Sequence, residues 1–357
     1  PDSKTSRWAR ESFVSDRVLD ESVGQEGVFE EIEPAVAGLL RGSSCTVLAY
    51  GSTGSGKSHT MMGAGDDAGS RPLPPEAGGH GGALAVGDGI LPRALERMYR
   101  EVGREAPGED GRGGDSGGSG GSGGSGRSSE SGRAAVVSVR AIEVYNNKLY
   151  DLLGEGFKPE RDLSVNIMRG PDGQDVIEGL SVAFPGDFPS ALDCVRAARG
   201  RAQVGRTSLN DRSSRGHVIF VLGVHGGACE AAADLRPSDP VMYVCDLAGP
   251  ERQNRAELTD DAGAVGAGGG GGSGSGSGNG NAELRNQAKD INKDTTELFR
   301  AWKQVRDGEK RVFYRGRKLT RVLQRLFVRP AGSPRMDCVM VVCVNPAESE
   351  YSETNKV

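Results

Sequence analysis

The sequence predicts an α/β fold in which one central sheet is covered by helices on both faces. Two observations support this prediction: short apolar or β-branched runs recur along the chain, and segments with helical periodicity lie between them. Such alternation is typical of layered α/β domains, whose sheets are buried on both faces. The chain has 357 residues, 36% hydrophobic and 26% charged, which is enough for one large core or two modest ones.

The strand candidates share short length and a high content of Val, Ile and Tyr; they are residues 45–50, 134–145, 217–225, 241–247 and 338–346. The helix candidates share apolar residues at spacings of three and four; they are residues 27–42, 90–103, 188–201, 291–305 and 318–327. Internal repeats are not visible.

Glycine is unusually abundant, at 56 residues, and much of it lies in two runs that begin at Gly111 and Ala262. These runs offer no apolar surface to offset the entropy cost of ordering. We therefore expect flexible Gly/Ser insertions at about 107–133 and 260–282, a further insertion at about 64–88, and an irregular segment at 1–12.

Several classes of protein are disfavoured by composition. The six cysteines form no CxxC pair, which favours free thiols in a reducing compartment, and the four histidines lack metal-ligand spacing. No apolar run approaches membrane-spanning length, and the N-terminus has no signal-peptide core. Because the chain does not begin with Met, we expect it to be a fragment. The net charge of -5 does not favour general polyanion binding, so any basic patch must be local.

The stretch "AYGSTGSGKSHT" matches the GxxxxGK[ST] spacing and lies between a strand candidate and a plausible helix start. Glycines allow successive backbone N–H groups to turn toward phosphate oxygens, Lys57 can reach the β- and γ-phosphates, and the Ser58 hydroxyl can ligate Mg²⁺. A Gly-rich turn without function is the alternative. The candidate phosphate-binding residues are Gly51, Ser52, Thr53, Gly54, Ser55, Gly56, Lys57 and Ser58.

A nucleoside triphosphatase also needs a group that senses the γ-phosphate. Asp246 ends the run "VMYVCD", where it can hold a metal through water, and the backbone N–H of Gly249 can meet the γ-phosphate. Alone, the DxxG spacing is a weak signal, and an Asp that begins an ordinary turn explains it better. Together with the phosphate-binding loop, it favours a switch. Proline follows at position 250, which raises the question of whether this switch still works.

A second polar cluster, "SLNDRSSRGHVIF", precedes that switch. Ser213 and Ser214 place two hydroxyls ahead of a strand, where they can bond phosphate and metal-bound water, and Arg215 can pair with an acid such as Glu251. The alternative is a solvated loop.

Residues 314–329 contain no acidic residue but carry Arg315, Arg317, Lys318, Arg321, Arg325 and Arg329. On a helix, Lys318, Arg321 and Arg325 share a face, and the leucines and Val322 can pack inward. A local basic ridge on an acidic protein suits an acidic partner with salt-sensitive binding. A solvated basic helix is the alternative, and nucleic acid is disfavoured because no aromatic platform accompanies the charges.

Taken in order, these motifs resemble the kinesin motor domain. "AYGSTGSGKSHTMMG" is similar to that family's P-loop, "IEVYNNKLYDLL" to its strand-and-turn motif, "NDRSSRGH" to switch I, "DLAGPER" to switch II, and "YRGRKLTRVLQ" to a helix on the microtubule-facing side. The upstream stretch "FVSDRVLDESVGQEGVFEEI" resembles the entry into the fold. The resemblance implies a P-loop NTPase of the kinesin-motor fold, with a mostly parallel-containing mixed sheet, over residues 13–357.

The resemblance also implies roles and partners. His59 would lie against the adenine of ATP, Ser214 and Ser58 would contact Mg²⁺ directly, and Asp246 would contact it through water. Ser213 would sense the γ-phosphate, and Arg215 with Glu251 would form an inter-switch ion pair that helps to position the attacking water. Microtubule contacts would come from Lys293, Arg315, Arg317, Lys318, Arg321 and Arg325. The expected function is ATP-driven movement on cytoplasmic microtubules, without a direct membrane or nucleic-acid partner.

The sequence departs from the family's pattern in several places. The family's first strand, last helix and neck linker are not recognisable, so the motor domain is expected to be truncated at both ends. Gly216 replaces a serine, which we expect to loosen switch I, and Gly316 with Arg317 replaces an acidic residue and a serine, which we expect to make the track-facing surface more basic. Ser52 and Ser58 replace a glutamine and a threonine at little chemical cost.

Pro250 lacks an N–H and restricts the residue before it, but the donor of Gly249 is intact, so we expect a stiffer switch rather than an inactive one. These departures keep open a nucleotide-gated or hydrolysis-deficient microtubule-binding protein. A GTPase is disfavoured because "NKDT" at 292–295 lacks the aspartate of the guanine-reading NKxD pattern.

Overall fold

The computed structural model describes residues 14–63, 84–105, 135–154, 164–170, 175–204, 216–226, 235, 239–250, 278–328 and 336–346. The N-terminal segment 1–12 and the predicted insertion at 107–133 lie outside the described residues. Of the other two predicted insertions, only residues 84–88 and 278–282 are described.

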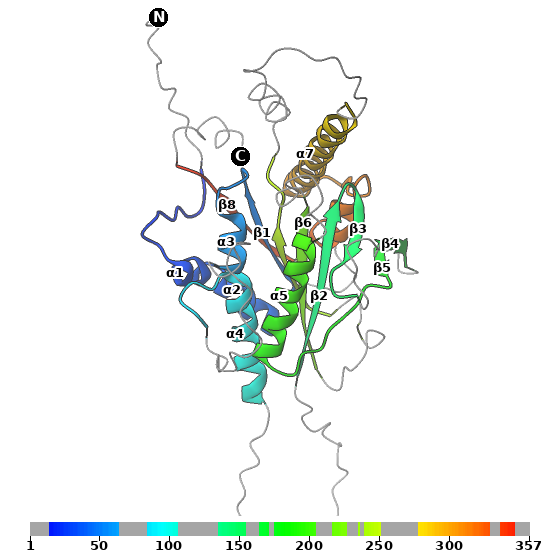
Figure 1. The fold of residues 1–357 in the computed structure, drawn as a ribbon. Helices are drawn as coiled ribbons and strands as arrows, with labels where there is room; N and C mark the ends of the chain where they lie inside the picture. Colours follow the sequence, from blue (N-terminus) through cyan, green and yellow to red (C-terminus); the bar gives the residue numbers. More distant parts are fainter. Residues whose placement is uncertain are drawn as a thin grey trace, which may run out of the picture.

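A mixed sheet of eight strands forms the centre of the molecule, in the order β5-β4-β3-β2-β6-β7-β1-β8 (Figure 1). Its strands are β1 (Cys45–Gly51), β2 (Val136–Tyr145), β3 (Lys148–Asp151), β4 (Ser164–Arg169), β5 (Asp175–Glu178), β6 (His217–His225), β7 (Val241–Asp246) and β8 (Asp337–Cys343). Parallel pairing joins β1 to β7 and β8, and the remaining pairs are antiparallel. The predicted strands and the mixed sheet are confirmed.

Helices cover both faces of this sheet, as predicted. They are α1 (Gln25–Glu30), α2 (Glu33–Leu40), α3 (Lys57–Met62), α4 (Ile90–Glu105), α5 (Phe188–Val204), α7 (Gly278–Arg306) and α8 (Lys318–Val322), followed by the 3-10 helix η3 (Gln324–Leu326). Within the described part of the chain, no helix is both long and apolar enough to cross a membrane.

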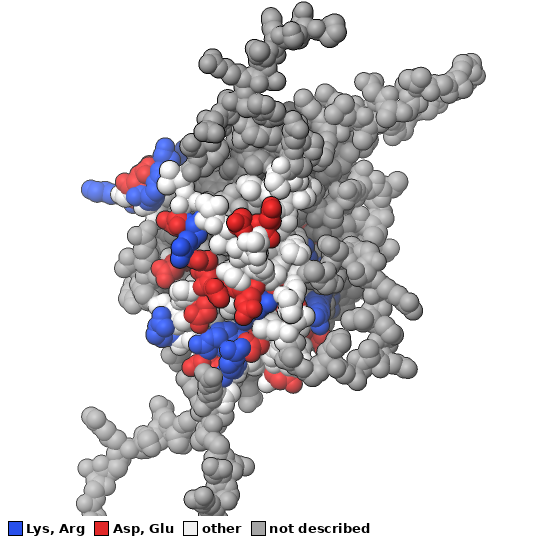
Figure 2. Space-filling model, turned by 90° about the vertical axis from the view of Figure 1, so that its left-hand side faces the viewer, with Lys and Arg blue, Asp and Glu red and all other residues white. Residues whose placement is uncertain are grey.

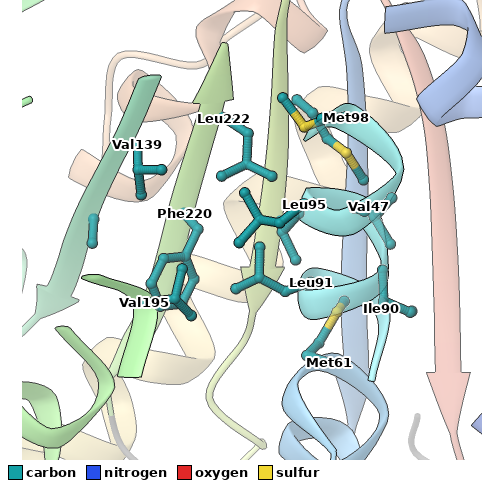
Figure 3. Packing of buried hydrophobic residues seen from close by; sticks show 14 of the residues in the cluster. Val47, Met61, Ile90, Leu91, Leu95, Met98, Val139, Val195, Phe220 and Leu222 are labelled. Carbon is teal, nitrogen blue, oxygen red and sulfur yellow. The ribbon is translucent and has the colours of Figure 1, made fainter. Parts of the chain in front are cut away.

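Alternate residues of the central strands enter two separate cores. Val47 of β1 and Phe220 of β6 pack with α2, α3, α4 and α5, and Figure 3 shows Leu91 and Leu95 of α4 directed toward Phe220 and its strand. Their sequence neighbours Leu48 and Ile219 pack with α7 and α8 on the opposite face. Because successive strand side chains point to opposite faces, strands covered on both sides appear in sequence as unbroken apolar runs.

The helices differ from prediction at three boundaries. The segment 27–42 forms two helices instead of one, because Pro34 lacks an N–H and occupies the first turn of α2, where that donor is not needed. Helix α7 begins at Gly278, well before the predicted residue 291, so the flexible insertion predicted up to residue 282 is wrong for 278–282. The segment "AELRNQAK" favours this extension, whereas nothing in the structure explains why "GNGN" before it is helical. The continuous helix predicted over 318–327 is wrong: α8 ends at Val322, and η3 follows.

The antiparallel half of the sheet contains β3, β4 and β5, which the apolar runs do not reveal. The turn from β2 to β3 is made by Asn146 and Asn147, with φ of 50° and 55°. Two consecutive left-handed residues match the right-handed twist of a tight hairpin, and asparagine tolerates that conformation better than most residues.

The parallel pairing sets which ends of the strands meet. Since β1 and β7 run in the same direction, the segments that follow Gly51 and Asp246 lie at the same edge of the sheet. Antiparallel β6 begins at that edge, with His217 close to Asp246 in the register. The end of α4 and the start of β2 lie at the opposite edge (Figure 1).

The face to the left in Figure 1 carries acidic and basic side chains close together, as Figure 2 shows. On α4, Arg97 pairs with Glu33 of α2 and with Glu101, and Arg100 pairs with Glu96. The described part of this face therefore has mixed charge.

Candidate functional site

The loop after β1 has the backbone geometry of a phosphate cradle. Gly54 and Gly56 have φ of 81° and 96°, a left-handed conformation that glycine adopts without strain. At Gly51, a Cβ atom would overlap the backbone oxygen of Cys343 at the end of β8. The glycines recognised in the sequence are therefore required by two turns and by one close approach between strands.

Lys57 and two serines supply the polar groups of this loop. The buried ammonium group of Lys57 donates to the backbone oxygens of Gly51 and Ser52, at 3.0 and 2.7 Å, so it curls back over the loop. The hydroxyl oxygens of Ser52 and Ser55 are buried without a hydrogen-bond partner. Buried hydroxyls that lack partners are uncommon and indicate a site for a polar group such as a phosphate. The loop thus fits the nucleotide that its sequence predicts.

The hydroxyl of Ser58 meets the carboxylate of Asp246 across the edge of the sheet. Ser58 Oγ donates to Asp246 Oδ2 at 2.6 Å, although the two residues are far apart in sequence. Hydroxyl and carboxylate oxygens are the ligands that Mg²⁺ prefers, so the pair fits that cation. The parallel register of β1 and β7 creates this contact because it places both strand ends together.

Arg199 of α5 is a member of this site that the sequence did not reveal. Its guanidinium donates to Asp246 Oδ2 at 2.8 Å, and the two side chains are 10% and 11% exposed. The contact neutralises a carboxylate that is largely removed from water, which reduces the cost of its burial. No local pattern in "RAARGR" distinguishes Arg199 from the other arginines of the helix, so only the fold could identify it.

The segment after β7 packs directly against the phosphate-binding loop. Leu247 N–H donates to the backbone oxygen of Ala49 at 3.3 Å, and a Cβ atom at Gly249 would lie 2.8 Å from both N and Oγ1 of Thr53. Only glycine allows this approach. The two segments predicted to form one site, DxxG and GxxxxGK[ST], are therefore in contact.

Ser213, Ser214, Arg215 and Glu251 lie outside the described residues, so their predicted roles stay predictions. The described chain resumes at Gly216, where a Cβ atom would overlap the carboxylate of Glu143 on β2. The serine-to-glycine departure at Gly216 thus accompanies a close approach by Glu143.

His59 is exposed on α3, two residues after the helix begins at Lys57, and is contacted by Gln25 of α1. The Gln25 amide donates to the backbone oxygen of His59 at 2.8 Å and lies 3.1 Å from its Nδ1. This contact holds the ring beside the phosphate-binding helix.

The basic residues of 314–329 divide into exposed and internally paired groups. Arg315 is half-exposed above the Tyr314 ring, and its Nε lies 3.9 Å from Oδ1 of buried Asp175. Lys293 is exposed on α7. Arg321 pairs with the other oxygen of Asp175 at 2.7 Å. The Arg325 side chain donates to the backbone oxygen of Asp239 at 3.0 Å, and Lys318 is partly buried.

Arg317 is paired with Asp290 and Asp294 of α7, so the expectation that it adds free positive charge to the surface is wrong. On the inner side of this segment, Leu319, Val322 and Leu323 are buried, as predicted.

Comparison with known proteins gives a consistent result. The kinesin motor domain family matches residues 1–264 of the chain. Kinesin-like protein KIFC2 of Homo sapiens is 28% identical over 340 residues, which cover 95% of this chain and 32% of that protein. Kinesin heavy chain of Neurospora crassa is 28% identical over 357 residues, which cover 99% of this chain and 30% of that protein. The chain thus spans about a third of the length of these relatives.

A solved structure of a fast kinesin has the same fold, with a TM-score of 0.63 at 24% identity over 97% of this chain and 77% of that one. This likeness supports the fold described above. The family match covers more than half of the sequence and includes the phosphate-binding loop and the DxxG segment. The chain therefore belongs to the kinesin motor domain family.

Proposed function

We propose that the chain is the catalytic core of a kinesin-like motor, a microtubule-stimulated ATPase that converts switch movement into movement along microtubules. The observation that carries this proposal is the 2.6 Å contact between Ser58 and Asp246, which joins the phosphate-binding loop to the DxxG switch. A nucleotide that binds the phosphate-binding loop would therefore change the position of the DxxG switch.

The described residues support specific roles in binding Mg-ATP. Lys57 would leave the backbone oxygens of Gly51 and Ser52 for the β- and γ-phosphates, and the unpartnered hydroxyls of Ser52 and Ser55 would donate to phosphate oxygens. Ser58 would hold Mg²⁺ directly, and Asp246 through water. The cation would neutralise charge on the phosphates during hydrolysis.

Hydrolysis in this site would depend on positioning and charge stabilisation, without a covalent enzyme intermediate. Gly249 would donate its backbone N–H to the γ-phosphate, since its segment already packs on Thr53. Ser213, Ser214 and the Arg215–Glu251 pair would complete the site by sensing the γ-phosphate and placing the water, and His59 would lie against the adenine.

The proposed track is the microtubule, and the proposed location is therefore the microtubule cytoskeleton of the cytoplasm. The solved fast kinesin is described in terms of its ATPase mechanism and its interactions with microtubules. Exposed Lys293 would meet an acidic partner, and half-exposed Arg315, which also lies 3.9 Å from Asp175, would add to that contact. Binding through such exposed charges would weaken as salt is raised.

The hydrolysis-deficient alternative is not favoured. Its motivation was Pro250, Gly216 and the inserted switch loop, yet Gly249 N–H is retained, and its segment contacts the phosphate-binding loop. The comparisons likewise identify motor domains.

The test is steady-state Mg-ATP turnover with and without microtubules. We expect turnover to rise with microtubule concentration, and Asp246→Asn to lower it by at least about 100-fold. Lys57→Ala should abolish nucleotide binding, whereas Lys148→Ala, an exposed lysine on β3, should leave turnover unchanged. Absence of turnover in folded protein under both conditions would contradict the proposal.

A further inference from the structure

Arg317 lies in a partly buried cluster of charges between α7 and the segment that leads into α8. Its Nε is 2.6 Å from Asp294 Oδ1, and its NH2 group is 3.0 Å from Asp290 Oδ1. The Arg317 side chain is 14% exposed and the Asp294 side chain 3% exposed. The arginine predicted to contact the track therefore directs its hydrogen bonds into the protein.

The two carboxylates lie one turn apart on α7, so one guanidinium holds two successive turns of that helix. A guanidinium is planar, and its donors have fixed directions, so it restrains rotation of the helix as well as its distance. Arg317 also donates to the backbone oxygen of Asp290 at 3.3 Å. The arginine thus sets the position of α7 against α8.

The cluster continues from Asp294 to the nucleotide side of the sheet. Asp294 Oδ2 lies 3.8 Å from His217 Nε2, at the start of β6, and His217 Nδ1 accepts the N–H of Ala248 at 3.1 Å. Because Nδ1 is the acceptor, the ring proton is on Nε2 and faces Asp294. Burial lowers the pKa of His217 to about 4, so the ring is neutral near pH 7.

The 3.8 Å separation is too long for a hydrogen bond, and His217 Nε2 is buried without a partner. A shift of less than 1 Å in either residue would complete the bond. Since Ala248 belongs to the segment that packs on the phosphate-binding loop, movement of that segment changes the position of this ring. The row of contacts runs from Ala248 through His217 and Asp294 to Arg317.

We propose that Arg317 is a positioning residue that couples the DxxG segment to α7 through Asp294 and His217, and that it is not a microtubule contact. The proposal rests on the proposed function of the chain. It assigns two adjacent basic features different roles: exposed Lys293 meets the track, whereas Arg317 transmits the state of the nucleotide site to the helix that carries Lys293.

The experiment compares Arg317→Gln, Asp294→Asn and the double variant with Lys293→Gln as the matched control. Arg317→Gln removes one positive charge from an internal site, and Lys293→Gln removes one from an exposed site. The readouts are maximal microtubule-stimulated turnover, the microtubule concentration at half-maximal turnover, and the dependence of microtubule co-sedimentation on salt.

For Arg317→Gln, we expect maximal stimulated turnover to fall on the order of 10-fold, with half-maximal concentration and salt dependence within about twofold of the parent. Asp294→Asn should behave in the same way, and the double variant should be no worse than either single variant because all three interrupt the same contacts. Lys293→Gln should raise the half-maximal concentration and reduce the salt dependence.

The proposal is overturned if Arg317→Gln behaves like Lys293→Gln, or if the losses in the double variant are additive. Thermal unfolding provides a readout independent of microtubules: Arg317→Gln should lower the melting temperature by roughly 5 to 10 °C because it leaves a buried carboxylate unpaired, and adding Asp294→Asn should restore part of that loss. Should Arg317→Gln fail to fold, the double variant takes its place in the turnover assay.

Failure of the proposed function gives a different result. A parent protein that binds nucleotide but shows no microtubule-stimulated turnover would refute the motor assignment. If microtubules do stimulate the parent, but the melting-temperature losses of Arg317→Gln and Asp294→Asn add up in the double variant, only the proposed coupling is refuted.

Discussion

Replacing Gly249 by alanine tests whether contact between the switch and the phosphate-binding loop is needed for catalysis. The added Cβ would lie 2.8 Å from both N and Oγ1 of Thr53, and 3.1 Å from the backbone oxygen of Gly51. Ordinary carbon contacts need about 3.5 Å, so the switch must retreat by about 0.7 Å. A hydrogen bond of about 2.9 Å from Gly249 N–H to the γ-phosphate would then lengthen to about 3.6 Å and be lost.

A hydrogen bond to a charged group contributes about 1.5 to 3 kcal/mol, so Gly249→Ala should slow ATP hydrolysis by roughly 10-fold to 150-fold. ADP affinity should change little, because ADP lacks the phosphate that this donor meets. Single-turnover hydrolysis and ADP titration measure the two effects separately. Gly103→Ala on α4, where nothing lies within 4 Å of the added Cβ, is the control and should leave both values unchanged. Hydrolysis by Gly249→Ala within twofold of the parent would refute the reasoning.

Three further variants test other contacts of the site. Pro250→Ser restores an N–H and relaxes the backbone before it, so ATP turnover should rise roughly threefold; unchanged turnover and microtubule stimulation would show that the proline does not stiffen the switch. Arg199→Met leaves the Asp246 carboxylate buried without its cation, so the free energy of unfolding in denaturant should fall by about 3 to 5 kcal/mol, and less when Asp246→Asn is added; equal losses would exclude the ion pair as the cause. His217 has a pKa of about 4 in the folded protein and 6.5 as its ordinary value, so the unfolded state binds more protons between these pH values and stability falls as the pH is lowered. Between pH 7 and pH 5 this residue should remove about 2 kcal/mol, and an unchanged pH dependence in His217→Asn would contradict that assignment.

The main strands could be predicted because their physical environment is reflected locally in the sequence. β1 and β7 are buried along their whole length, and each appears as an unbroken apolar run. Exposed Met168 and Val176 lie on β4 and β5, so neither a continuous nor a clearly alternating apolar pattern marks these strands. β4 pairs with β3, and β5 pairs with β4. These pairings join separate segments, so no single segment of the sequence specifies them.

In the candidate site too, features contained within one segment could be predicted, and features that depend on distant residues could not. The phosphate-binding loop was predictable because its glycines, Lys57 and Ser58 act within one short segment whose spacing is fixed by backbone geometry. The positions of Arg199 and Arg317 were not, since each depends on a carboxylate far away in sequence. The run of arginines in the sequence consequently predicts surface charge, although the fold turns Arg317 inward against α7.

The opposite edge of the sheet gives this domain a place for engineered additions. Glu105 ends α4 and Val136 begins β2 at the edge away from Ser58 and Asp246, and no described residue of the nucleotide site comes from there (Figure 1). The sequence between them predicts a flexible Gly/Ser insertion, and doubling the length of such a connection costs only about 0.6 kcal/mol in closure entropy. A fluorescent reporter or an affinity tag joined between α4 and β2 would therefore leave the strand register and the nucleotide chemistry intact, and would label the motor from its far side.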